Sequence, residues 1–188
     1  GSDVVSYRRG GVAPAAATAS DTDRDETAGS KVIIQQQDKP ELDKNAENTD
    51  ADGAYTVEGV ASVVCPSIVE IETYGDAKGE QLSGTGSGII SSEDGYIITN
   101  NHVVDGAQSV SVQLSDGTSL DAEIIGTDEQ TDLAVIKVTP TSDLTAAEFG
   151  DSDELEPGEY AYAIGSPGGV QFANTITGGR ISAINRDL

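Results

Sequence analysis

The sequence has no methionine and no tryptophan, and it has only one cysteine and one histidine in 188 residues. Cys65 has no partner within the chain, so a disulfide framework is excluded, and its apolar neighbours favour a buried small side chain over a reactive thiol. Without methionine, residue 1 is not an initiator, and we expect the chain to be an internal piece of a longer protein. No apolar run approaches the roughly 18 residues that a membrane-spanning helix needs.

Basic residues are also scarce. Ten lysines and arginines stand against 33 aspartates and glutamates, which gives a formal net charge of −23. The imbalance is uneven, since residues 1–55 hold eleven acidic and six basic residues, a net of −5, and the remainder therefore carries −18. A surface this acidic repels phosphate backbones and anionic lipid. The composition therefore excludes nucleic acid as an expected partner.

Residues 1–55 contain few large apolar side chains and are rich in Ala, Thr, Asp, Gly, Gln and Lys. Such a segment buries too little surface to offset the entropy that ordering it would cost. We therefore predict a disordered acidic linker over residues 1–55, followed by a folded region that begins near Tyr55.

A calcium-binding pattern within this linker is incomplete. Asn48, Asp50 and Asp52, followed by Gly53, match the first half of an EF-hand loop. The position that should carry the bidentate glutamate is Gly59, and no helical pattern precedes the loop. We therefore expect no metal site and no cofactor.

After a short helical or irregular entry at residues 57–64, the chain reads as a series of β-strands. Apolar and polar residues alternate in several short segments that are separated by turn residues. These segments lie at 66–73, 89–90, 96–98, 109–114, 119–126 and 133–138. About six strands by residue 138, with no convincing long helix, predict a closed antiparallel barrel. Further strands are expected near 160–165 and 174–184.

Two turns define hairpins in this series. The Gly-containing turn at 91–95 reverses the chain between the segments 89–90 and 96–98. At 115–118, Asp116 and Gly117 form a dipeptide that tolerates the positive φ of a type I′ turn, which is the turn we predict there.

His102 follows the second strand of the first hairpin, and Asp132 precedes the apolar segment 133–138. Each residue taken alone has an ordinary explanation, as a histidine without chemical function and as a carboxylate at a solvated strand end. Together they suggest more, because in Ser-His-Asp catalysis an aspartate accepts the imidazole Nδ1–H and orients the ring. Two strand ends of one barrel can bring such a pair together.

The blocks GTGSGIISSEDGYIITNNHVV, TDLAVIKV, FGDSDELEPGEYAYAIGSPGG and TGGRISA occur in this order and resemble consecutive motifs of the HtrA/DegP family of trypsin-like serine proteases. The resemblance runs from about Val57 to Leu188. It implies an all-β double barrel of the trypsin/chymotrypsin type, with His102 as general base and Asp132 as its orienting acid. We accordingly expect the first barrel over residues 56–145 and the start of a second, truncated barrel over residues 146–188.

The resemblance leaves the nucleophile unplaced. The serine of this family lies in a GNSGGP-type loop roughly 70 to 80 residues after the triad aspartate, whereas the sequence continues for 56 residues after Asp132. Ser166 does not replace it, because residues 164–168 read Ile-Gly-Ser-Pro-Gly and do not match G-x-S-x-G. In addition, Pro167 has no N–H for an oxyanion hole. We therefore expect this chain alone to be inactive.

The resemblance further implies a serine endopeptidase of protein quality control that degrades unfolded or misfolded proteins outside the cytoplasm. It implies a homotrimer, a PDZ domain downstream and a membrane anchor upstream of residue 1. The alternative is a non-catalytic relative, in which a protease-like barrel is kept as a binding or scaffolding module. The presence of both His102 and Asp132 favours the protease, since nothing structural requires that pair.

Overall fold

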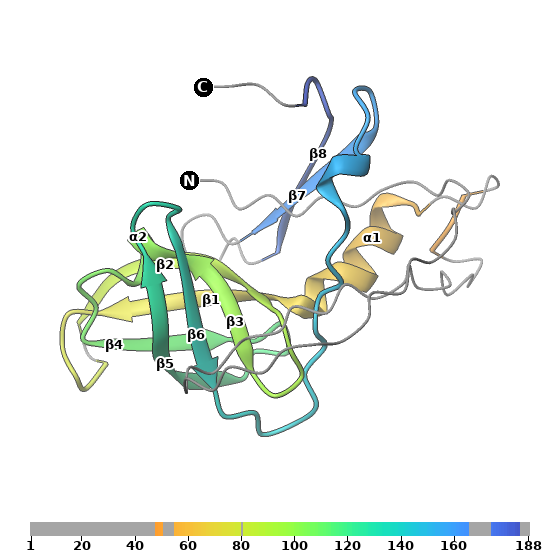
Figure 1. Cartoon of the computed structure of the whole chain (residues 1–188). Coiled ribbons are helices and arrows are strands. Elements are labelled where there is room, and N and C mark those ends of the chain that lie inside the picture. Colours follow the sequence, from red (N-terminus) through yellow and green to blue (C-terminus); the bar gives the residue numbers. More distant parts are fainter. Residues whose placement is uncertain (1–47, 51–54, 80, 166–173, 185–188) are drawn as a thin grey trace, which may run out of the picture.

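The computed structural model describes residues 48–50, 55–79, 81–165 and 174–184, which form short helices and eight strands (Figure 1). The helical elements are α1 (Val57–Val64), the 3-10 turn η1 (Cys65–Ser67), α2 (Asn101–Val104) and the 3-10 turn η2 (Ser152–Glu154). The strands are β1 (Ile68–Tyr74), β2 (Leu82–Ile90), β3 (Tyr96–Asn100), β4 (Ser109–Gln113), β5 (Ser119–Asp128), β6 (Leu133–Val138), β7 (Tyr160–Gly165) and β8 (Thr175–Arg180).

Six antiparallel strands form a closed barrel in the order β1-β2-β3-β6-β5-β4. β1 and β4 complete the circle, with Ile71 opposite Val112. Each barrel strand therefore has a neighbour on both sides, so the barrel presents no open strand edge. The predicted all-β class and the closed barrel are confirmed.

Alternate side chains of the barrel strands point inward and form the core. Gly88 of β2 lies among them, because a Cβ at this position would be 2.8 Å from side-chain atoms of both Ile71 and Ile97. The glycines of β2 thus make room for packing. The fully buried side chains of this core include Val69, Ile71, Ile90, Ile97, Val112, Ile136 and Val138.

The turn between β4 and β5 differs from the predicted type I′ turn. A type I′ turn needs positive φ at both central residues, but here Gly117 has a φ of 87° and Asp116 does not have a positive φ. The Leu114 N–H donates to the Thr118 carbonyl oxygen at 2.8 Å, which closes a three-residue loop. The type I′ prediction is wrong because an Asp-Gly pair also fits this loop, in which only the glycine is left-handed.

Strands β7 and β8 form a separate two-stranded sheet, and residues 181–184 lie outside it. Ile164 of β7 packs in a second apolar cluster with Val60 of α1 and Ile68 of β1. Cys65 is partly buried against the same cluster, and burial raises the pKa of its thiol. This cluster holds the β7–β8 sheet against the outer surface of the barrel.

Several predictions concern residues outside the described ranges, namely 1–47, 51–54, 80, 166–173 and 185–188. They include most of the proposed linker, Asp52 of the calcium pattern and Ser166. The division into segments 1–55, 56–145 and 146–188 therefore stays a prediction. Across the ranges that are described, no helix has the length and apolar character to cross a membrane.

Glu70 is a buried carboxyl group without a partner. It is only 2% exposed, and neither of its carboxyl oxygens accepts a hydrogen bond. The residues opposite it on β2 and β4, Ser87 and Gln113, are uncharged. Two positions along β1 lies Glu72, which already accepts a hydrogen bond from the Tyr74 hydroxyl at 2.7 Å. Burial, and after it the charge of Glu72, raises the pKa of Glu70.

We expect Glu70→Gln to stabilise the folded chain at neutral pH and to leave its stability unchanged in acid. Because the folded-state pKa of Glu70 is raised, this carboxyl is best tolerated when protonated, and stability falls as pH rises from the ordinary carboxyl value through the folded one. A neutral amide cannot ionise and therefore removes this pH-dependent loss, which is about 1.4 kcal/mol for each unit by which the pKa is raised.

Urea unfolding of both chains across a pH series measures this effect. Glu129→Gln is the matched control, because Glu129 is exposed in the turn before β6. If the free energies of unfolding of wild type and Glu70→Gln changed with pH in parallel, this would show that burial does not raise the pKa of Glu70.

Candidate active site

The ladder between β3 and β6 brings two distant segments together. Its last pair is Asn100 opposite Leu133. One residue further, the Asn101 N–H donates to the Asp132 carbonyl oxygen at 3.0 Å. β3 ends here and the one-turn helix α2 begins at once, which places His102 beside Asp132.

Helix α2 is seated on the barrel by its two valines. Val104 is 1% exposed and belongs to the barrel core. Val103 packs over Gly86 of β2, where a Cβ would be only 2.6 Å from a Val103 methyl carbon. Gly86 therefore permits the close approach that fixes α2. This also fixes the position of His102, which lies in α2 between Asn101 and Val103.

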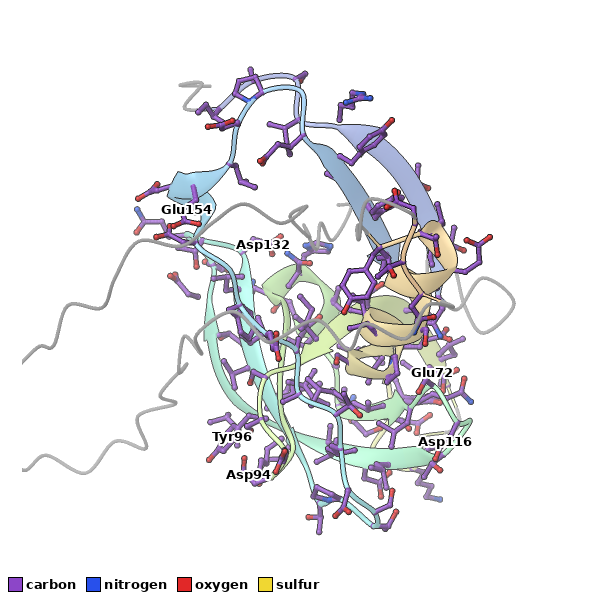
Figure 2. The ribbon with its side chains drawn as sticks, turned by 90° about the vertical axis from the view of Figure 1, so that its right-hand side faces the viewer. Glu72, Asp94, Tyr96, Asp116, Asp132 and Glu154 are labelled. Carbon is purple, nitrogen blue, oxygen red and sulfur yellow. The ribbon has the colours of Figure 1, made fainter. Side chains whose placement is uncertain are left out.

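His102 and Asp132 are joined directly through their side chains. His102 Nδ1 lies 2.6 Å from Asp132 Oδ2, which is a short hydrogen bond. The side chains are 53% and 44% exposed, respectively, so the pair is open to solvent. Figure 2 shows Asp132 on the side of the barrel that carries β7 and β8, while Asp94 and Tyr96 lie at the far end of β3 and β6.

Asp132 receives further hydrogen bonds from the same segment. The backbone N–H of His102 donates to Oδ1 at 2.9 Å, so the carboxylate contacts both the ring and the main chain of this residue. The side-chain amide of Asn100 donates to the Asp132 carbonyl oxygen at 3.1 Å and to Oδ2 at 3.3 Å. The backbone of Asp132 is left-handed, with a φ of 56°.

These contacts lower the pKa of the Asp132 carboxyl. The largest cause is the hydrogen bond from the His102 backbone N–H, followed by the bond from the His102 ring, with a smaller contribution from Asn100. A carboxylate that ionises this readily stays charged at neutral pH. It can therefore hold a proton on His102 Nδ1, which leaves Nε2 unprotonated and able to accept a proton.

The structure thus brings together both predicted site residues, His102 and Asp132. Ser166 lies outside the described residues. Among the residues that the structure describes, no group of three or more His, Cys, Asp or Glu side chains is placed to hold a metal ion.

Two features of the site were not predicted from the sequence, namely the contact of Asn100 and the left-handed backbone of Asp132. A signal for the first exists, since asparagine is a preferred residue directly before a helix. Asn100 precedes α2 but its side chain makes no capping bond there, and it bonds to Asp132 instead. Aspartate also tolerates the left-handed region better than most residues do.

The barrel is closed and antiparallel, and it carries an aspartate–histidine pair at the ends of two neighbouring strands. An aspartate that orients a histidine in this way is found in hydrolases that use a Ser-His-Asp triad. The family described as the trypsin-like peptidase domain matches residues 86–187, more than half of the chain. The chain belongs to this family. The recognised resemblance to HtrA/DegP proteases and the trypsin-like fold are both confirmed.

Its relatives within the family are HtrA-type proteases. The chain is 43% identical over 112 residues to the "Periplasmic pH-dependent serine endoprotease DegQ" of Escherichia coli, covering 59% of this chain and 24% of that protein. It is 45% identical over 116 residues to the "Serine protease Do-like HtrA" of Bacillus subtilis, covering 60% of this chain and 26% of that protein. The chain thus spans about a quarter of the length of these curated relatives.

A solved structure shows the same relationship in three dimensions. It is an HtrA-type protease, AlgW, determined with a tripeptide, and it superposes with a TM-score of 0.62 at 36% identity. The match covers 70% of this chain and 41% of that one.

Proposed function

We propose that this chain is the His- and Asp-bearing part of an HtrA-like serine endopeptidase that degrades unfolded or misfolded proteins. The observation that carries the proposal is the 2.6 Å contact between His102 Nδ1 and Asp132 Oδ2. This contact is the half of a serine-protease triad that activates the nucleophile. The relatives named as serine proteases, at 43 and 45% identity, support it.

Each residue has one part in the proposed reaction. His102 takes the proton of a serine hydroxyl through Nε2 as the oxygen attacks a peptide carbonyl carbon, and the C–N bond then breaks as the imidazolium returns this proton to the leaving amine. Asp132 keeps the ring oriented and stabilises its charged form. The serine and the oxyanion-hole amides belong to a loop that this sequence does not contain.

The remaining family properties form part of the same proposal. A tripeptide accompanies the solved HtrA-type relative, which supports a polypeptide as the substrate class here. A relative named as periplasmic supports an extracytoplasmic location. The homotrimer, the downstream PDZ domain and the upstream membrane anchor rest on the family resemblance alone.

The proposal is tested by comparing this chain with a longer form, expressed from the parent open reading frame with the residues that follow Leu188. We expect the longer form to cleave casein and to react with a fluorophosphonate probe, and the 188-residue chain to do neither. The reason is that a base without its nucleophile and oxyanion donors retains little catalysis. Casein cleavage by the 188-residue chain alone would place the activity elsewhere.

The longer form also separates the protease from a non-catalytic binding module. A serine in a GNSGG-type loop, together with probe labelling, supports the protease. Alanine or glycine at the serine position, with binding of unfolded casein but no cleavage, would overturn the proposal in favour of the module.

A further inference from the structure

Asn100 occupies a position where its side chain has two possible uses. It is the residue before α2, and an asparagine there ordinarily caps the helix by accepting a backbone N–H with its side-chain oxygen. No such bond is present. The N–H of His102, in the first turn of α2, instead donates to Asp132 Oδ1 at 2.9 Å, so an aspartate from the turn before β6 caps the helix.

The amide of Asn100 is thereby available for Asp132. Its nitrogen carries two hydrogens, and it lies 3.1 Å from the Asp132 carbonyl oxygen and 3.3 Å from Oδ2. One amide group therefore bridges the backbone and the side chain of the same residue. Such a bridge restricts rotation about the bonds that connect the Asp132 carboxylate to its own main chain.

The bridge acts on a residue whose backbone is left-handed. Asp132 has a φ of 56°, in a region that most residues with a Cβ avoid and that aspartate tolerates better than most. Its carbonyl oxygen is held from two directions in this conformation, by the Asn101 N–H at 3.0 Å and by the Asn100 amide. Because Asn100 ends β3 and pairs with Leu133, its own position is set by the barrel.

We propose that Asn100 is a positioning residue, which fixes the Asp132 carboxylate so that Oδ2 faces His102 Nδ1. Asn100 acts through Asp132, which accepts both of its side-chain hydrogen bonds. Its second hydrogen bond to Oδ2 also favours the ionised carboxylate and so keeps the shared proton on the histidine. The catalytic meaning of this role rests on the proposed function, whereas the coupling between Asn100, Asp132 and His102 does not.

The test uses the 188-residue chain, because its single histidine gives one set of imidazole signals. In Asn100→Ala we expect the pKa of the Asp132 carboxyl, followed by ¹³C NMR, to rise, and the Nδ1–H tautomer, followed by ring ¹⁵N shifts, to lose population. Gln108→Ala is the matched control, since it removes an exposed carboxamide six positions after His102. A folded Asn100→Ala chain in which both signals match the wild type would overturn the proposal.

A measurement on the unaltered chain covers the case in which Asn100→Ala does not fold. The side-chain NH₂ signals of Asn100 must shift with the ionisation of Asp132, while those of Gln108 must not. Asn100 NH₂ signals that stay constant while Asp132 titrates would also overturn the proposal.

In the longer form, Asn100→Ala should lower kcat about tenfold, equivalent to 1.36 kcal/mol, with little change in KM. If the longer form proves inactive while the NMR coupling is present, the proposed function fails and the positioning role stands. If the longer form is active and Asn100→Ala changes neither kcat nor the NMR signals, the positioning role alone fails.

Discussion

His102→Ala in the longer form of the protein is expected to reduce casein cleavage about a millionfold and to abolish fluorophosphonate labelling. Without the imidazole, the serine hydroxyl keeps its proton and remains a weak nucleophile. Triad members act as a unit, so the loss of the base removes nearly all of the catalysis that the triad provides. Initial rates of cleavage with equal amounts of both proteins measure the effect.

Folding should survive this change. The His102 ring is 53% exposed, and helix α2 is held by Val103 and Val104, so the thermal unfolding midpoint should stay close to that of the wild type. Gln108→Ala serves as the control in the same part of the chain and should retain full activity. Undiminished cleavage by His102→Ala would remove this residue from the proposed mechanism.

Asp132→Asn is expected to lower kcat of the longer form about ten-thousandfold, with the structure intact. Asparagine accepts the left-handed backbone that Asp132 adopts at a φ of 56°, so the fold has no reason to change. The amide NH₂ facing Nδ1 then becomes a donor, which forces the ring proton onto Nε2. A ring protonated at Nε2 cannot accept the proton of the serine.

The same substitution has a direct readout in the 188-residue chain. Ring ¹⁵N shifts of His102 should change from the Nδ1–H to the Nε2–H tautomer in Asp132→Asn. Asp121→Asn, which alters an exposed aspartate on β5, should leave the tautomer as it is. Retention of the Nδ1–H form in Asp132→Asn would contradict the role given to this carboxylate.

Acid should separate the pair without any substitution. The pKa of Asp132 is lowered in the folded chain, so the stability that its ionised form contributes is present above the ordinary carboxyl value and is lost as pH falls through the folded value. Because both side chains are about half exposed, solvent screens this contribution and keeps it small.

The barrel was predictable because local signals agree with the global fold. Alternating apolar residues mark its strands, and the Gly-containing turn before Tyr96 marks the hairpin between β2 and β3. The meeting of His102 and Asp132 was accessible only through the resemblance and the expectation that strand ends converge. Sequence spacing alone does not define which residues of two strands thirty positions apart face each other.

Other features depend on the register of the strands and on which elements pack over the outer face of the barrel. The sequence does not encode either of these locally. The bond from Asn100 to Asp132 exists because Asn100 pairs with Leu133, and a shift of one residue would turn the side chain to the opposite face. Glu70 reads as a solvent-facing residue of an alternating strand. It is buried in the structure, and the outer face of β1 packs at Ile68 against α1 and β7.

The order of strands in the barrel has a consequence for how the chain folds. The ladders β1–β4 and β3–β6 join residues roughly forty positions apart, and such non-local pairing places small β-proteins among those that fold in milliseconds to seconds. The hairpins β2–β3 and β4–β5 need only local contacts and can form earlier. The contact between His102 and Asp132 depends on β3 pairing with β6, so it cannot appear before these two strands meet. During refolding, the NMR signals of the one imidazole in the chain therefore report the time at which β3 pairs with β6.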